Sequence, residues 1–371
     1  MTGSLRRWWL RIHRWLALSV GWVLACVALM GALLVLVGPL DRYLHPELFR
    51  ARSGAAAASA ALEPVRQRLL AEFGPATALG FRLPRAPGAT LAVTVKAHWS
   101  GTVYVDPATG LEQGRRGETE GVRNLLFKLH SSLGLGDIGK ATLASIALVY
   151  LLLLLTGVVL WWPRRWPPSL KIELRKGALR GMFDLHRTGG TLLGLLIAVS
   201  VATGAYMAWR PLHGAVTTLA GERAVKPPKL PKLDGGNHSA PDLDAMLARA
   251  RAALPGAPVS IATLPAHPDR PLRIRLIVPD DPHPNGLSSV WLDPRTGELL
   301  GTNRWNTLDP GARVVAIVYP LHTGELGGPV LEVLVLLNGL ALATLGVTGV
   351  WLWWKRRPRA TAPALARSET R

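Results

Sequence analysis

The chain has 371 residues, a formal net charge of +19 and 49% hydrophobic residues. Such a basic chain suggests nucleic-acid binding, but its apolar residues form four long runs flanked by basic residues, which is typical of a membrane protein and disfavours a nucleic-acid partner. The single cysteine, Cys26, lies in the first run and no CxxCH motif occurs, which excludes an intramolecular disulfide and covalent c-type haem attachment.

Four segments are long and apolar enough to cross a bilayer, whose hydrocarbon core of about 30 Å requires roughly 20 helical residues. None of them contains a charged residue: Trp15–Leu40, Ala141–Trp162, Thr188–Trp209 and Val333–Trp354. The first run is too long for the apolar part of a signal peptide, so we expect it to be retained.

Basic residues in short connecting segments predict the orientation, because lysine and arginine concentrate on the cytoplasmic side. They precede span one, separate spans two and three, and follow span four: Arg6, Arg7, Arg11, Arg14; Arg164, Arg165, Lys171, Arg175, Lys176, Arg180; Lys355, Arg356, Arg357, Arg359, Arg367, Arg371. With four spans, these three segments share one side of the membrane. Both termini are therefore predicted to be cytoplasmic.

The two long connections are predicted to lie outside the cytoplasm, and each reads as one helix followed by strands. The expected elements are a helix at Leu62–Phe73 with strands at Ala78–Leu83, Thr90–Ala97 and Thr102–Val105, then a helix at Asp242–Leu254 with strands at Val259–Leu264, Leu272–Val278 and Ser289–Leu292. Segments 50–60 and 221–241 have linker composition. The predicted organisation is helix 1–40, outer module 41–122, helix 123–165, cytoplasmic loop 166–182, helix 183–211, outer module 212–326, helix 327–357 and cytoplasmic tail 358–371.

The second half of the chain restates the first. Leu125–Arg165 aligns without gaps to Ile317–Arg357, and Leu185-His186-Arg187 matches Ile12-His13-Arg14. The outer segments match as well, each with an Asp-Pro-x-x-Gly turn after a strand, at 106–110 and 293–297. This pattern predicts a tandem repeat of one helix–module–helix unit, with an all-α four-helix membrane core and two α+β modules.

Four of the ten histidines occupy matching positions of the repeat. His13 and His186 lie at the cytoplasmic ends of spans one and three, while His130 and His322 lie just before spans two and four on the outer side. A histidine near the membrane within a helix is costly without a partner, which makes each a candidate functional residue. The glycines in Leu125–Lys140 leave open whether His130 lies on a helix.

Small residues follow His13 and His186 at i+4 and i+8, on the same helix face: Ala17, Gly21, Gly190 and Gly194. A flat macrocycle such as haem requires such a recess, with imidazole as its axial ligand. The adjacent Arg14 and Arg187 could then pair with haem propionates. The alternative is ordinary close packing of helices through small residues.

The remaining histidines are weaker candidates. His45 and His213 lie near the outer ends of spans one and three and could replace an outer ligand. We expect His98, His238, His267 and His283, in strands or Pro-rich loops, to be solvated. No cysteine or carboxylate cluster completes a tetrahedral zinc site.

Taken together, these features resemble the PepSY-associated transmembrane family, also called iron-regulated membrane proteins, over almost the whole chain. The resemblance rests on His13-Arg14-Trp15-Leu16, Leu185-His186-Arg187, the two Asp-Pro-x-x-Gly modules, and Leu321-His322-Thr323-Gly324 leading to Thr348-Gly349 and the tryptophan-basic end. The glycine-rich stretch with Asp137 after His130 departs from its counterpart at Gly324–Gly328.

The resemblance implies a four-helix core in the bacterial inner membrane with two extracytoplasmic PepSY-like modules. Some members are similar to siderophore reductases that carry b-type haem. It implies about two haem b groups per chain, with His13, His186, His130 and His322 as the matching histidines. From their membrane side we infer an inner haem held by His13 and His186 and an outer haem held by His130 and His322.

The favoured function is therefore an oxidoreductase that conducts electrons across the membrane to a ferric siderophore or another ferric chelate outside. The cytoplasmic segments contain no Gly-x-Gly-x-x-Gly motif, so the donor is expected to be membrane quinol or a separate reductase. Two alternatives remain open: a non-catalytic PepSY membrane protein that binds or regulates an outer partner, and a haem or metal carrier.

Overall fold

The computed structural model describes residues 3–54, 60–163, 166–221, 227–232 and 241–357. The chain forms two compact units: a first unit of Met1–Leu29, Ile146–Val201 and Asn338–Arg371, and a second unit of Met30–Ser145 and Ala202–Leu337. Several predicted features lie outside the described residues, namely Arg164, Arg165, Arg359, Arg367, Arg371, His238 and parts of both linkers.

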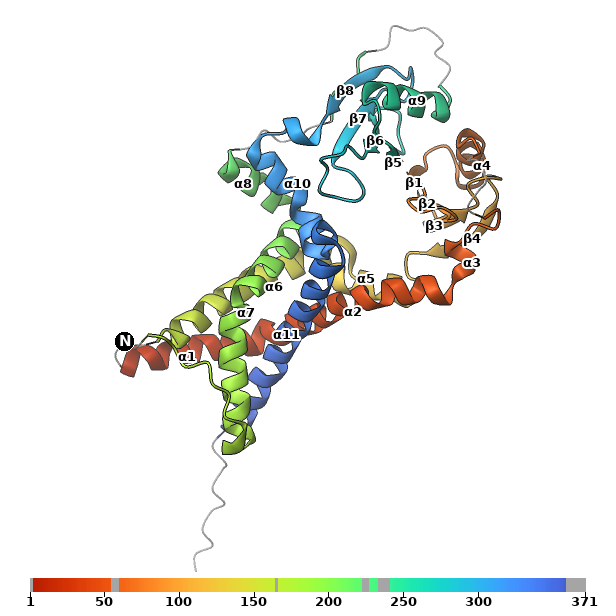
Figure 1. Cartoon of the computed structure of the whole chain (residues 1–371). Helices are drawn as coiled ribbons and strands as arrows, with labels where there is room; N and C mark the ends of the chain where they lie inside the picture. The colour runs from red at the N-terminus through yellow and green to blue at the C-terminus, as the bar shows by residue number, and fades with distance from the viewer. Residues whose placement is uncertain (1–2, 55–59, 164–165, 222–226, 233–240, 358–371) are drawn as a thin grey trace, which may run out of the picture. The chain divides into compact units, whose positions relative to one another are not determined.

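Within the described residues, four helices are long and apolar enough to cross a membrane, and they match the four predicted spans, of which the second and third end one residue past their helix (Figure 1). They are Gly3–Leu44, built from α1 (Gly3–Leu16), the π-helical turn η1 (Ala17–Gly21) and α2 (Trp22–Leu44); α6 (Gly136–Trp161); α7 (Ala178–Ala208); and α11 (Gly328–Lys355), which follows η4 (Glu325–Gly327). Each extends beyond its apolar run into polar turns. Their exposed leucines, among them Leu195 and Leu152, are suited to contact lipid.

Small and polar residues pack the helices of the first unit together. A Cβ atom added at Gly346 of α11 would lie 2.5 Å from the Cβ of Ala25 in α2, so only glycine allows this approach. The side-chain amide of Asn338 in α11 donates to the carbonyl oxygen of Leu196 in α7 at 3.4 Å. The contact between α2 and α11 therefore depends on a residue without a side chain.

The second unit contains one eight-stranded antiparallel sheet in the order β4-β3-β2-β1-β5-β6-β7-β8. Its strands are β1 (Ala78–Arg82), β2 (Leu91–Lys96), β3 (Ser100–Val105), β4 (Glu112–Gly117), β5 (Val259–Leu264), β6 (Leu272–Leu276), β7 (Ser288–Leu292) and β8 (Leu299–Asn303). All six predicted strands are present, and β4 and β8 are additional. The strands expected in two outer segments therefore join in one sheet, through the pairing of β1 with β5.

Alternation along the strands separates the two faces of the sheet. In β1, Leu79 and Phe81 are fully buried in a core shared with Leu69 of α4 (Glu63–Phe73) and Leu247 of α9 (Leu243–Ala253), while Arg82 lies on the opposite face. The two predicted helices thus cover one face of the sheet.

The helices α4 and α9 also stabilise each other's first turn. The backbone N–H of Leu243 donates to Glu63 Oε2 at 2.8 Å, and the N–H groups of Leu62 and Glu63 donate to the carboxylate of Asp244 at 3.0 and 2.9 Å. Carboxylates stabilise helix N-termini by accepting from free N–H groups.

A buried ion pair connects the sheet to α2. Arg116 of β4 donates from one guanidinium nitrogen to both carboxylate oxygens of Asp41, at 2.7 and 2.8 Å, and both residues are buried. Removing one partner would leave an unpaired buried charge, which costs about 3–5 kcal/mol.

The remaining helices of the described chain are shorter. They are α3 (Pro46–Phe49), α5 (Val122–Ser132), α8 (Arg210–Ala220) and α10 (Pro310–Thr323), with the 3₁₀ turns η2 (Leu174–Lys176) and η3 (Trp305–Thr307). Of these, α5 and α10 are central to the candidate site because they carry His130 and His322.

Candidate cofactor site at two histidine pairs

The first histidine pair lies in the first unit. His13, in the last turn of α1, and His186, in α7, have ring centroids 6.5 Å apart and ring planes at 84°. Each ring is held by a threonine: His13 Nδ1 is 2.8 Å from Thr156 Oγ1, and His186 Nδ1 is 3.0 Å from Thr348 Oγ1. These threonines occupy matching positions in α6 and α11.

The threonine hydroxyls determine which nitrogen of each ring carries the proton. The Thr156 hydroxyl donates to the carbonyl oxygen of Leu153 at 2.6 Å, and the Thr348 hydroxyl donates to that of Thr344 at 2.7 Å. A hydroxyl has one hydrogen, so it accepts from the imidazole Nδ1–H. We assign both rings as Nδ1–H tautomers, which leaves the lone pair of Nε2 available to a metal ion.

A glycine follows each of these threonines and lies against the histidine. A Cβ atom added at Gly157 would lie 3.5 Å from His13 Cε1, and one at Gly349 would lie 3.2 Å from His186 Cε1. In each Thr-Gly dipeptide, the threonine therefore forms a hydrogen bond with the imidazole and the glycine leaves space for the ring. The sequence showed this dipeptide as part of the repeat, but its contact with the histidines was not predicted.

The second histidine pair lies in the second unit. His130, in the last turn of α5, and His322, in the last turn of α10, have ring centroids 6.1 Å apart and ring planes at 39°. His322 Nδ1 lies 2.9 Å from Thr203 Oγ1 of α7. The open question about His130 is settled: α5 is helical to Ser132 and ends at Leu133, which adopts a left-handed conformation at φ 53°.

Glycines also adjoin the second pair. A Cβ atom at Gly31 would lie 2.6 Å from His130 Cε1, and one at Gly204 would lie 3.2 Å from His322 Cε1. Neither glycine was predicted as a site residue. A sequence signal existed, because Gly31 and Gly204 each lie 18 residues after the histidine that begins their span, His13 or His186.

The glycines that were predicted occupy different surroundings. Because η1 is a π-helical turn, Gly21 does not keep the regular α-helical register with His13, and a Cβ there would lie 3.7 Å from Ala17 and Leu153 atoms. In α7 the helix is regular, and a Cβ at Gly194 would meet no atom within 4 Å, while one at Gly190 would lie 4.0 Å from Leu345. Open space beside His186 is thus found along α7.

The two predicted arginines differ in their contacts. Arg14 is exposed. Arg187 donates to the carbonyl oxygens of Ser169 and Lys171, at 3.2 and 3.4 Å, and lies 3.4 Å from the carboxylate of the fully buried Asp184. The side chain of Arg187 therefore fixes the preceding loop to α7, and its pairing with a propionate stays a prediction.

The other candidate histidines have contacts of their own. His45 pairs with Glu47 at 3.0 Å, and His213 stacks on Tyr206 at 4.2 Å. His98 and His267 are exposed, as predicted.

The prediction of a solvated His283 is wrong, because its side chain is only 2% exposed. Its Nδ1 accepts from the backbone N–H of Asn285 at 2.7 Å, so Nε2 carries the proton and lies 3.4 Å from Glu325 Oε2. Burial, reinforced by neighbouring guanidinium groups, lowers the pKa of His283 to about 4. The loop between β6 and β7 buries His283, and the Pro-rich composition of this loop did not indicate that burial.

Among the described residues, no group of three or more histidine, cysteine, aspartate or glutamate side chains could hold a metal ion. A search of curated proteins finds no significant match to the chain. The family model described as PepSY-associated TM region matches residues 10–356, nearly the whole length. With its four long apolar helices, the chain is a membrane protein that belongs to the PepSY-associated transmembrane family.

Proposed function

We propose that the two histidine pairs are axial ligands of two b-type haems and that the chain is an oxidoreductase conducting electrons across the membrane. The observation that carries the proposal is the pairing of imidazoles at matching repeat positions, with His13 and His186 held as Nδ1–H tautomers. Bound haem would supply one-electron iron chemistry at a potential set by its ligands and surroundings.

The ring separations fit this role. Two imidazoles that share one metal ion through bonds of about 2.0–2.1 Å have ring centroids about 6 Å apart. The measured separations are 6.5 Å for His13 with His186 and 6.1 Å for His130 with His322. No third protein ligand lies with either pair among the described residues, so a metal ion held there would take its remaining ligands from a group such as a porphyrin.

The protein's contribution is to orient the ligands. A metal-binding histidine usually donates its second ring N–H to a partner, which fixes the ring and raises its basicity. Thr156 and Thr348 accept this bond for the first pair. Gly157, Gly349, Gly31 and Gly204 leave the space that the rings occupy.

The finer features of the proposal rest on the sequence and on family membership. We infer a tandem repeat with two PepSY-like modules outside the bacterial inner membrane and cytoplasmic termini. Membrane quinol or a separate reductase would donate electrons, and a ferric siderophore or another ferric chelate would accept them outside.

The visible spectrum of the purified full chain tests the proposal. We expect about two haems per chain and a split α/β band pattern after reduction with dithionite. His13→Ala or His186→Ala should remove one haem, and His130→Ala or His322→Ala the other. The matched controls are His45→Ala and His213→Ala, which change histidines outside both pairs and should keep both haems.

The same variants separate the alternatives in proteoliposomes with reductant inside and ferric chelates outside. A conduit loses chelate reduction with any of the four ligand variants. A colourless protein would contradict the proposal and favour a regulatory PepSY protein. Bound haem without electron transfer would favour a carrier.

A further inference from the structure

A row of three side chains crosses the sheet on the face opposite α4 and α9. The register pairs Arg82 of β1 with Ile261 of β5, and Ile261 with Arg275 of β6. Directly paired residues point to the same face. Two arginine side chains therefore flank one isoleucine, and their Cα atoms lie two strand spacings apart, or about 9–10 Å.

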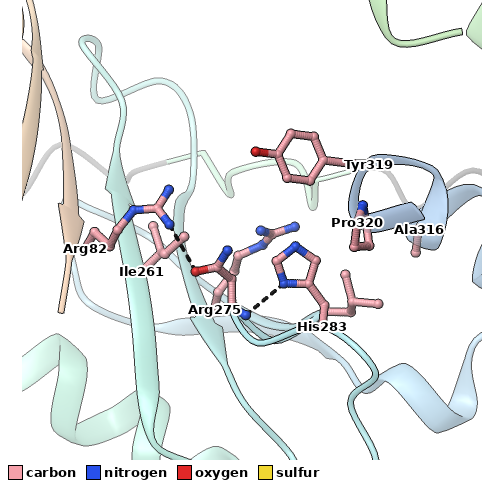
Figure 2. Close-up of a pocket in the computed structure, with 9 residues that line it drawn as sticks. Arg82, Ile261, Arg275, His283, Ala316, Tyr319 and Pro320 are labelled. Carbon is pink, nitrogen blue, oxygen red and sulfur yellow. Dashed lines mark hydrogen bonds between the residues drawn. The ribbon is translucent and has the colours of Figure 1, made fainter. Parts of the chain in front are cut away.

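Helix α10 and the loop after β6 cover this row and form a cavity (Figure 2). Its volume is about 270 Å³, and α10 lines it with Ala316, Tyr319 and Pro320. The His283 ring stacks on Tyr319 at 6.1 Å, and Asn285 accepts a hydrogen bond from Arg82 at 3.0 Å. The cavity is smaller than a site for a drug-sized molecule and suits a small ligand.

The cavity carries an excess of positive charge. Among the described residues, no carboxylate lies within ion-pair distance of Arg82, Arg275 or the nearby Arg85, and Arg275 Nε is buried without a hydrogen-bond partner. Burial and the positive charge of Arg82 lower the pKa of Arg275. The two guanidinium groups therefore repel each other, and each destabilises the charged form of the other.

Two acidic residues lie near the cavity, and they differ in their contacts. Asp281 accepts the backbone N–H groups of Val278 and Leu287, both at 2.8 Å, and so orders its own loop. Glu325 lies 3.4 Å from His283 Nε2, and its Oε2 has no hydrogen-bond partner among the described residues, so its charge offsets part of the positive charge near the cavity. The guanidinium groups therefore retain capacity to bind an anion.

We propose that this cavity is a binding site for a small molecule bearing carboxylate or phosphate oxyanions. Arginine presents its N–H groups in a planar fork that matches both oxyanions, and bonds to charged groups are the stronger kind. The guanidinium groups of Arg275 and Arg82 would donate to the ligand, and Asn285 would hold Arg82 in place. The inference does not depend on haem binding.

Calorimetric titration of the full chain in detergent, in buffer free of other oxyanions, tests the site with citrate and with inorganic phosphate as separate probes. We expect one saturable site per chain for at least one probe. Arg275→Gln and Arg82→Gln should each weaken binding by about tenfold or more, because each removes a charge-assisted bond. Binding of citrate alone identifies a carboxylate site, and binding of phosphate alone identifies a phosphate site.

Two matched controls separate the cavity from general charge and from misfolding. Arg273→Gln removes a charge from the same face of β6 but outside the cavity lining, and should change affinity less than about twofold. Ala316→Trp should block the cavity with both arginines retained, whereas Val314→Trp, at an exposed position of α10, should not. Failure of both probes to saturate, or equal weakening by Arg273→Gln, would overturn the inference.

Discussion

Both histidine pairs bring two imidazole rings about 6 Å apart, but the residues at the positions beside the rings differ in part. In the first pair, both Nδ1 atoms bond a threonine of a Thr-Gly dipeptide. In the second pair, Thr203 holds His322, whereas the residue matching Thr203 in the first half is Met30, which has no hydroxyl. Three of the four imidazoles therefore contact a Thr-Gly dipeptide, and Met30-Gly31 occupies the corresponding position beside His130.

This difference has a chemical consequence. The group that accepts the second ring N–H of a metal ligand tunes its basicity and fixes its orientation. Ring planes at 84° in the first pair and 39° in the second reflect distinct surroundings. We infer that two similar cofactors bound at these pairs would differ in potential.

The largest expected effect comes from filling the space beside His130. Gly31→Leu places a side chain where even a Cβ atom lies 2.6 Å from the ring, so the second pair should lose its haem. Gly38→Leu, in the same helix α2 with no atom within 4 Å of an added Cβ, is the control and should keep both haems. Haem content per chain measures the result, and two haems in Gly31→Leu would refute the assigned contact.

Removal of a threonine hydroxyl should have a smaller effect and should affect the first pair alone. Thr348→Val keeps the side-chain shape but removes the acceptor for His186 Nδ1–H, and loss of such a partner costs about 10–100-fold in metal-site affinity. Thr344→Val, one turn earlier on an exposed position of α11, is the control. The measurement is haem retention under competition with apomyoglobin. Equal retention in both variants would show that the hydroxyl does not orient the ligand.

We expect the smallest effect from lowering the pH, which should reduce the stability of the second unit because that unit contains His283. The folded pKa of about 4 lies below the ordinary histidine pKa of 6.5, so the unfolded chain binds more protons between these values and stability falls as pH decreases from 6.5 towards 4. From pH 7 to pH 5 the loss should be about 2 kcal/mol. Thermal unfolding should therefore be less pH-dependent in His283→Gln than in the natural chain. Identical pH profiles would contradict the burial of a neutral imidazole.

Much of the architecture could be predicted because its signals are local. Long apolar runs identified the four spans, and alternation identified six strands. The strands β4 and β8 escaped prediction because Glu112–Gly117 and Leu299–Asn303 lack a regular apolar alternation. The pairing of β1 with β5 joins residues about 180 positions apart, and no local pattern encodes it.

The histidine pairs were predicted from repeat position and membrane side, but not the atoms that support them. Gly31 and Gly204 lie five helical turns after His13 and His186, far beyond the i+4 and i+8 positions that predict the recess. A π-helical turn after His13 also interrupts the regular helix on which that spacing depends. Contacts between different helices, such as His186 with Thr348, depend on packing that a single chain segment does not reveal.

The pairing of β1 with β5 has a consequence for how the protein could be divided. In the intact chain these two strands form hydrogen bonds along one edge of each, and the edge strands of the sheet are β4 and β8. A fragment that ends before α7 would leave the backbone groups of β1 open along one side, which is a template for another strand. Such fragments would be prone to exchange strands between molecules, so the covalent link between the halves also protects against self-association.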